Sequence, residues 1–189
     1  MTYFLDFDRT LFDTDAYNRG LLDIPACKPF RDELQALLEA PPHAVPTKQE
    51  RDAIWDKLSA LLISGELSFA PGELAKYVYP DVPEFLRMLG NEAIIITYGE
   101  KTRQKAKVDS AFAGIVRLTT LYTEDKLKAE YFEQYPHLLA ASSLFVDDRA
   151  LELETMEKLF PQVKLFQMVR GGGPGDGRWT VVRSLSDLP

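Results

Sequence analysis

Cysteine and histidine are scarce in this chain of 189 residues, which has one cysteine, Cys27, and two histidines. A single cysteine cannot form an intrachain disulfide, and this usage fits a reducing compartment. We interpret Cys27 as a packed side chain rather than a nucleophile. The histidines, His43 and His137, lie far apart in the sequence, and two isolated histidines do not indicate a metal site.

Long apolar runs and an excess of positive charge are also missing. No apolar run approaches the roughly 18 residues that a membrane-spanning helix needs. The first residues do not resemble a secretory signal, because Asp6 and Asp8 interrupt the apolar stretch and no basic segment precedes it. The formal net charge of -7 argues against a general nucleic-acid surface. We therefore expect a cytoplasmic protein that binds neither membranes nor nucleic acid, and its oligomeric state stays open.

What the chain has is the composition of a globular domain, with 46% hydrophobic and 27% charged residues. Apolar runs predict buried strands, which we expect at 3–5, 93–96, 115–118, 143–146, 163–168 and 179–182. Helical patterns separate them after residue 83, and we expect those helices at 85–89, 101–112, 125–135 and 151–160. Strands that alternate with helices predict an α/β fold with a parallel, doubly wound sheet.

The segment between residues 15 and 83 does not share this alternation. Apolar residues recur there at helical spacing in 30–38 and again in 54–62. Thr47 and Glu50 predict a capping box at the start of the second helix, and a third amphipathic piece surrounds Leu74. We therefore expect two parts: an α/β core formed by 1–14 and 84–189, and an inserted helical cap formed by 15–83.

Polar side chains follow the predicted strands at their carboxyl ends: Asp6 with Asp8, Thr97, Lys126, and Asp147 with Asp148. In an open α/β sheet, ligands bind at this edge. Asp6 and Asp8 are two residues apart, so on an extended backbone both side chains point the same way. Their carboxylates repel each other unless a charge neutralises them. Mg²⁺ prefers oxygen ligands, and Asp147 or Asp148 would add a third carboxylate.

Such a site is suited to phosphoryl transfer. A carboxylate can attack phosphorus to give an acyl phosphate that water then hydrolyses, and we assign this role to Asp6. A second carboxyl can protonate the leaving oxygen and later activate the water, and we assign this role to Asp8. Thr97 and backbone amides beside it, including that of Tyr98, would bind the phosphate oxygens. Lys126 would add positive charge and hold the nucleophile in place.

The motifs together resemble those of the haloacid dehalogenase superfamily. Residues 4–14 resemble its first motif, Asp-x-Asp-x-Thr after an apolar strand. Residues 94–99, Lys126 and residues 144–148 are similar to its second, third and fourth motifs, and they follow in the same order. The resemblance spans nearly the whole chain. It implies a Rossmann-like core and a helical cap that shields the site and selects the substrate.

The resemblance also implies a function. It implies a magnesium ion bound by the Asp6 side chain, the Asp8 backbone carbonyl and an aspartate of the fourth motif. Most relatives of this layout are phosphatases of small metabolites, and the dehalogenases usually lack the second aspartate, here Asp8. We predict a Mg²⁺-dependent phosphomonoesterase acting on a small phosphorylated metabolite. A phosphotransferase or mutase on the same scaffold, and a catalytically silent binding protein, are the alternatives.

Several assignments have competitors. The fourth motif is Asp-Asp, and by register we align Asp148 with the metal-binding aspartate. Asp147 would then orient Lys126, while Glu152 falls where a spaced acid usually lies. Lys128 competes with Lys126 as the third-motif lysine, and Lys105 and Lys107 are less favoured.

Two further features, Arg9 and the glycine-rich run 170–177, have no catalytic role in the predicted site. Arg9 would reach either a second anionic group of the substrate or solvent. The glycine-rich run 170–177 leads into an expected strand, whereas a phosphate-binding glycine loop leads into a helix. We therefore interpret this run as a surface connection.

Overall fold

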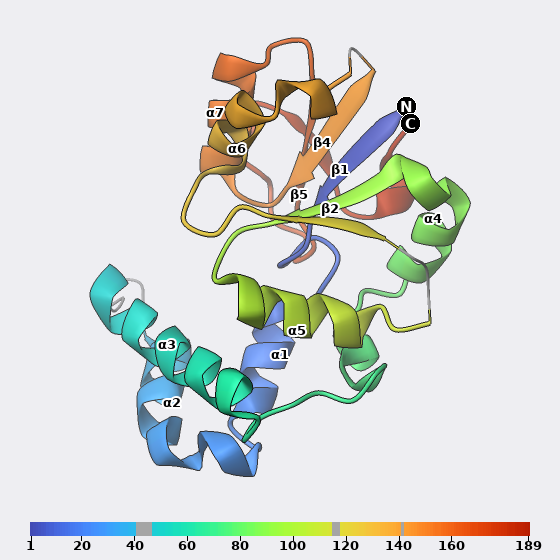
Figure 1. The fold of residues 1–189 in the computed structure, drawn as a ribbon. Helices are drawn as coiled ribbons and strands as arrows, with labels where there is room; N and C mark the ends of the chain where they lie inside the picture. Colours follow the sequence, from blue (N-terminus) through green and yellow to red (C-terminus); the bar gives the residue numbers. More distant parts are fainter. Residues whose placement is uncertain (41–46, 115–117, 141) are drawn as a thin grey trace.

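The computed structural model describes residues 1–40, 47–114, 118–140 and 142–189, and its centre is a six-stranded parallel sheet (Figure 1). The strands are β1 (Thr2–Asp6), β2 (Ala93–Thr97), β3 (Thr119–Tyr122), β4 (Ser143–Asp147), β5 (Lys164–Met168) and β6 (Thr180–Val182). Their spatial order is β3-β2-β1-β4-β5-β6, so the predicted doubly wound α/β sheet is confirmed. The strand that we predict at 115–118 falls mostly on residues outside the described ranges, and β3 begins at Thr119.

Strands β2 and β3 lie on one side of β1 and strands β4 to β6 on the other, so the order of strand addition reverses between β1 and β4. In this strand order, the crevice between these two strands at their carboxyl ends is where ligands bind. Leu5 pairs with Ile95 of β2 on one side and with Val146 of β4 on the other. Because Asp6 and Asp147 each follow one residue later, the register brings these two acids to the same edge.

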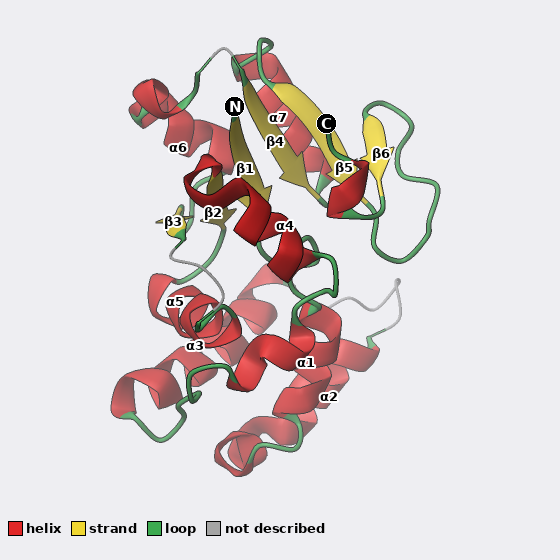
Figure 2. Ribbon diagram, turned by 90° about the vertical axis from the view of Figure 1, so that its right-hand side faces the viewer, coloured by secondary structure: helices red, strands yellow, loops and turns green. Residues whose placement is uncertain are grey.

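Helices cover both faces of the sheet. On one face, Phe4 and Phe145 pack with Phe132 of α6 (Lys128–Gln134) and with residues of α7 (Ala150–Leu159). On the other face, Leu5 belongs to a larger core that includes Phe85 of α4 (Val82–Leu89). Figure 2 shows α4 in front of the strands, with α6 and α7 beyond them. Alternate residues of β1 therefore serve two different cores.

Between β1 and β2 the chain forms α1 (Thr14–Leu21), η1 (Pro25–Phe30), α2 (Arg31–Glu39), α3 (Lys48–Ser64) and η3 (Glu73–Tyr77). In both views these helices lie together below the sheet, and α5 (Lys101–Ala111) lies between them and the strands (Figures 1 and 2). The predicted capping box of Thr47 and Glu50 is confirmed at the start of α3. The piece around Leu74 is a 3-10 helix, and the division into core and cap at 15–83 stays a prediction.

The start of α6 differs from the expectation. We predict a helix from residue 125, but α6 begins at Lys128. The reason is a turn, in which the Lys126 N–H donates to the Thr123 carbonyl at 3.0 Å and Glu124 has a positive φ of 56°. Lys126 therefore belongs to the turn, and Lys128 to the first turn of the helix.

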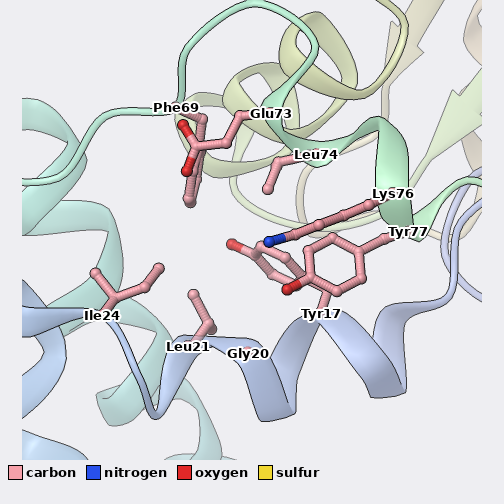
Figure 3. A pocket seen from close by; sticks show the side chains of 9 residues that line it. All are labelled: Tyr17, Gly20, Leu21, Ile24, Phe69, Glu73, Leu74, Lys76 and Tyr77. Atoms are coloured by element: carbon pink, nitrogen blue, oxygen red, sulfur yellow. The ribbon is translucent and has the colours of Figure 1, made fainter.

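A cavity of about 60 Å³ lies between α1 and η3 (Figure 3). Its walls include Tyr17, Phe69, Lys76 and Tyr77. A Cβ atom at Gly20 would lie 2.2 Å from the Tyr77 hydroxyl, so a side chain at position 20 would force the Tyr77 ring to shift. None of the strand-end carboxylates lines this cavity. Within the described ranges, no helix is long and apolar enough to cross a membrane.

Arg170 links the loop after β1 to Asp81 at the start of α4 and, through Asp81, to the C-terminal segment. Its guanidinium donates to the Thr10 carbonyl at 2.7 and 3.0 Å and to the Asp81 carboxylate at 2.8 and 2.9 Å. Asp81 also accepts from the Leu185 N–H at 2.7 Å and the Ser184 hydroxyl at 2.9 Å. Arg170 opens the glycine-rich run, which joins β5 to β6 as a connection between strands.

Replacing Asp81 with alanine should destabilise the fold. The change leaves a mostly buried guanidinium without its carboxylate and removes two further hydrogen bonds, so we expect a loss of about 2–3 kcal/mol in the free energy of unfolding. Urea denaturation measures this. Glu84→Ala, an exposed acid in the adjacent helix, is the matched control and should change stability by less than about 0.5 kcal/mol. Equal stability of the two variants would contradict the role of the network.

Candidate active site

Three carboxylates meet at the edge where β1 and β4 end. One oxygen from each of Asp6, Asp147 and Asp148 lies within 4.8 Å of the others. Asp6 is only 4% exposed and Asp147 is fully buried. The register of β1 with β4 creates this cluster, as the sequence predicts for Asp6 and the Asp147-Asp148 pair.

A buried lysine joins two of these acids. The Lys128 ammonium donates to Asp6 and, at 2.5 Å, to Asp147. The Lys128 N–H donates to Glu152 at 2.9 Å, which anchors the first turn of α6. Burial lowers the pKa of Lys128, but the charges of Asp147 and Asp6 outweigh burial and raise it overall. The lysine therefore stays charged between the two carboxylates.

The expectation that Lys126 holds the nucleophile is wrong. Lys126 is exposed, and its ammonium donates to the Gln134 side chain at 3.0 Å. Because α6 begins only at Lys128, it is this residue that faces the sheet edge, and it takes the place that we considered for either lysine. The sequence contains a signal: Lys128, Ala129 and Phe132 have the spacing of one helix face, and all three are buried.

Burial and crowding of like charge dominate the electrostatics of the cluster. Burial raises the pKa of Asp6 well above its usual value, against the attraction of Lys128, and the neighbouring acids raise it further. Burial, followed by the charge of Asp147, raises the pKa of Asp148 to about 6. Asp6 Oδ2 is buried and has no hydrogen-bond partner among the described residues. A divalent cation would relieve this excess of negative charge, so the cluster fits one.

The two aspartates of the fourth motif have different partners. Asp147 accepts from Lys128 through Oδ2 and from the Arg149 N–H through Oδ1 at 2.9 Å. Both of its oxygens are therefore engaged. Asp6 and Asp148 are then the acids best placed to hold a cation, in agreement with the alignment that favours Asp148.

Asp8 points to a different set of partners. Its carboxylate accepts from the Thr14 hydroxyl at 2.6 Å, from the Gln104 amide at 2.9 Å and from the Lys107 ammonium. We expect Asp6 and Asp8 to project together from an extended strand, but β1 ends at Asp6, and Asp8 is not in the carboxylate cluster that the described residues form. The chain bends after Asp6, and this bend sends Asp8 toward α5.

Lys107 was not singled out as a partner of Asp8 by sequence reasoning. It is 4% exposed, and its ammonium lies 5.2 Å from the ring centre of Phe7 and 5.4 Å from those of Phe12 and Tyr17. Burial opposes ionisation of Asp8, but the charge and hydrogen bond of Lys107 prevail and lower the pKa of Asp8. The available signal is helical spacing, since Gln104, Lys107 and Val108 share the buried face of α5.

The second motif lies beside the cluster. Thr97 ends β2, one residue beyond the partner of Asp6, and its buried hydroxyl has no hydrogen-bond partner among the described residues. The Tyr98 carbonyl accepts from the Gln104 amide at 2.8 Å, so Gln104 links the second motif to Asp8. Arg149 lies over the Tyr98 ring, 5.4 Å from its centre.

Arg9 lies at the rim. Its backbone has a positive φ of 60°, and its half-exposed guanidinium pairs with Asp15 at 2.8 Å. This arrangement occupies the side chain at the surface. Contact of Arg9 with a second anionic group of a substrate stays a prediction.

Two solved structures resemble the whole chain. One is a protein from Burkholderia xenovorans LB400 described as a haloacid dehalogenase-like hydrolase, with a TM-score of 0.69, 20% identity, and coverage of 99% of this chain and 94% of that one. The other is the UTR4 protein of Saccharomyces cerevisiae, with a TM-score of 0.54, 18% identity and 99% coverage of both chains. No protein-family model and no curated protein sequence matches. The chain has the haloacid dehalogenase-like fold.

In this haloacid dehalogenase-like fold the predicted motifs occupy one sheet edge. Asp6 ends β1, Thr97 ends β2, Lys128 opens α6 and Asp147 ends β4. The four motifs, which are separate in the sequence, thus lie together in the structure, with Lys128 in place of Lys126. Likeness at this identity establishes the fold alone, because one fold supports many different reactions.

Lys128→Met should destabilise the protein when no divalent cation is present. The change leaves Asp6 and Asp147 buried without the Lys128 ammonium that they share, so we expect a loss of about 3 kcal/mol in the free energy of unfolding at neutral pH. Denaturation in EDTA measures it. Lys126→Met is the control and should stay within about 0.5 kcal/mol of the parent. A larger effect at position 126 than at 128 would overturn the assignment.

Proposed function

We propose that this protein is a magnesium-dependent phosphohydrolase that transfers the phosphoryl group of a small phosphomonoester to Asp6 and then to water. The observation that carries the proposal is the state of the Asp6 carboxylate. One oxygen is held by Lys128, while the other, Oδ2, has no hydrogen-bond partner among the described residues. A carboxylate held rigidly with one unengaged oxygen is prepared for nucleophilic attack.

Mg²⁺ fits the proposed site through the side chains of Asp6 and Asp148, to which the family resemblance adds the Asp8 backbone carbonyl. When bound, the ion supplies positive charge to the phosphate oxygens. The buried hydroxyl of Thr97 and nearby backbone amides, including that of Tyr98, would donate to the same oxygens. Lys128 adds a fixed positive charge beside Asp6.

The first step forms a bond between Asp6 and phosphorus and breaks the ester bond of the substrate. The leaving oxygen then needs a proton, which Asp8 would donate. In the second step water attacks the aspartyl phosphate, and Asp8 would accept the proton of that water. Lys107, Gln104 and Thr14 favour the ionised form of Asp8 and fix its orientation, which suits its role as the base. The proton that Asp8 takes from the water is the one that it donates to the leaving oxygen in the next turnover.

The proposed substrate is a small phosphorylated metabolite in the cytoplasm. Helices α1 to α3 lie below the sheet, with α5 between them and the strands, and an inserted layer of this kind favours small molecules over polymers (Figure 1). The net charge of -7 also disfavours a nucleic-acid substrate.

Asp6→Asn should remove at least about a thousandfold of the phosphate release, because an amide is a poor nucleophile and cannot form the acyl phosphate. The measurement is free phosphate released from a panel of phosphometabolites in MgCl₂, repeated after EDTA treatment. Asp15→Asn, which removes an exposed carboxylate near the same motif, is the control and should retain parental activity. Full activity of Asp6→Asn or of the EDTA-treated protein would contradict the mechanism. Transfer of phosphate to an added sugar hydroxyl instead of water would favour a phosphotransferase.

Asp8→Asn should slow hydrolysis of the aspartyl phosphate, because the variant lacks the base for the attacking water. We expect turnover to fall by about a hundredfold or more, while affinity for substrate changes little. Acid quenching with a ³²P-labelled ester should show a larger steady-state fraction of phosphorylated protein than in the parent. An unchanged rate with no accumulated phosphoprotein would exclude this role for Asp8.

A further inference from the structure

Arg103 is the third residue of α5 and lies directly beside the second motif. A Cβ atom at Gly99 would lie 3.2 Å from Arg103 Nη2, so the guanidinium rests against the backbone that follows Thr97 and Tyr98. Gly99 has a φ of 117°, a conformation that L side chains rarely adopt. The second motif thus contains a glycine where the guanidinium comes close.

The other side of Arg103 is covered by the inserted helices. Its Cζ atom lies 5.2 Å from the ring centre of Trp55 in α3. The Ser59 hydroxyl of α3 also donates to Glu100, the residue that caps α5, at 3.1 Å. Figure 1 shows α3 running beside α5. Arg103 therefore stands where the proposed cap meets the sheet edge.

The guanidinium of Arg103 has no hydrogen bond or ion pair with any residue that the structure describes. Asp8 is the acid that attracts it most, but the oxygens of Asp8 are occupied by Lys107, Gln104 and Thr14. Burial lowers the pKa of Arg103 in spite of this attraction, so its charge is only partly compensated. Arg170 shows the contrast, because its buried guanidinium donates to both Asp81 and Thr10.

The charge balance of the site makes Arg103 available to a ligand. Lys128 pairs with Asp6 and Asp147, and Lys107 pairs with Asp8, so neither lysine nor these acids provide a partner for Arg103. A half-buried guanidinium without an anionic partner costs free energy, and an anion bound to Arg103 would recover it. A guanidinium stacked on an indole ring keeps its N–H edge free for two parallel hydrogen bonds to a carboxylate or phosphate.

We propose that Arg103 binds a second anionic group of the substrate, so that the protein acts on short phosphomonoesters that also carry a carboxylate or a second phosphate. The inference rests on the proposed function and specifies its substrate class. Arg103 then selects substrate by the acidic tail, while Asp6 and its partners act on the phosphate. Trp55 holds the guanidinium from the side of the inserted helices, so both parts of the chain contribute to the choice.

Direct binding tests this without any turnover. Calorimetry in MgCl₂ compares three phosphonates: phosphonopropionate with a carboxylate tail, ethylenebisphosphonate with a second phosphonate, and propylphosphonate with a neutral tail. We expect at least one acidic-tailed ligand to bind the parent about tenfold or more tightly than propylphosphonate, and the preferred tail identifies the anion. Arg103→Met should lose this preference while its affinity for propylphosphonate changes less than about threefold.

Two variants control for charge and folding. Lys105→Met removes the same charge from the exposed face of α5, where Lys105 pairs with Asp109, and should bind like the parent. Arg103→Lys retains the charge and should restore part of the preference. Thermal melting establishes that each variant is folded, and Arg103→Gln replaces Arg103→Met if the latter is not. Equal affinity of the parent for all three ligands, binding of none, or equal loss for all three in the Arg103 variant would overturn the inference.

Turnover of p-nitrophenyl phosphate, which has no second anionic group, tests the hydrolase separately. Lys105→Met, which changes only the exposed face of α5, should alter it less than about threefold. A parent that distinguishes the phosphonates but releases no phosphate contradicts the proposed function and supports the anion site. A parent that releases phosphate but does not distinguish them supports the function and refutes the anion site.

Discussion

The ion pairs of one buried lysine organise the carboxyl edge of the sheet. Lys128 lies between Asp6 and Asp147, which end neighbouring strands, and its own backbone is anchored by Glu152. Two carboxylates so deeply buried would repel each other, and a single shared ammonium makes their approach possible. The same contacts hold Asp6 in one orientation. Stability of the edge and orientation of the proposed nucleophile therefore depend on one side chain.

A second buried lysine, Lys107, neutralises and orients Asp8. Lys107 is enclosed by three aromatic rings and faces Asp8, so a hard positive charge sits in apolar surroundings with one carboxylate as its partner. Lys107 pairs with Asp8 alone, whereas Lys128 is shared by Asp6 and Asp147. Among the described residues, Asp148 and Arg103 have no ion pair of their own. Asp148 would bind a cation and Arg103 an anion, and a magnesium-bound phosphate with an acidic tail offers both.

The sequence was sufficient for the alternation of strands and helices, the polar residues at the strand ends and the capping box of Thr47 and Glu50, because these depend on local patterns. It was insufficient for the choice between Lys126 and Lys128, which depends on a turn at Glu124 with positive φ that delays α6 by three residues. It also missed the pairing of Lys107 with Asp8, since that contact forms only when α5 packs across the bend after β1. Contacts between distant segments are set by packing, and no single sequence window contains them.

The most direct test of this account is the identity of the residue that becomes phosphorylated. Borohydride reduces an aspartyl phosphate to homoserine, so the protein can be trapped during turnover of p-nitrophenyl phosphate and mapped by peptide mass spectrometry. The account predicts homoserine at position 6 and at no other aspartate. Homoserine elsewhere, or its absence from a protein that is releasing phosphate, would contradict the central claim that Asp6 is the nucleophile.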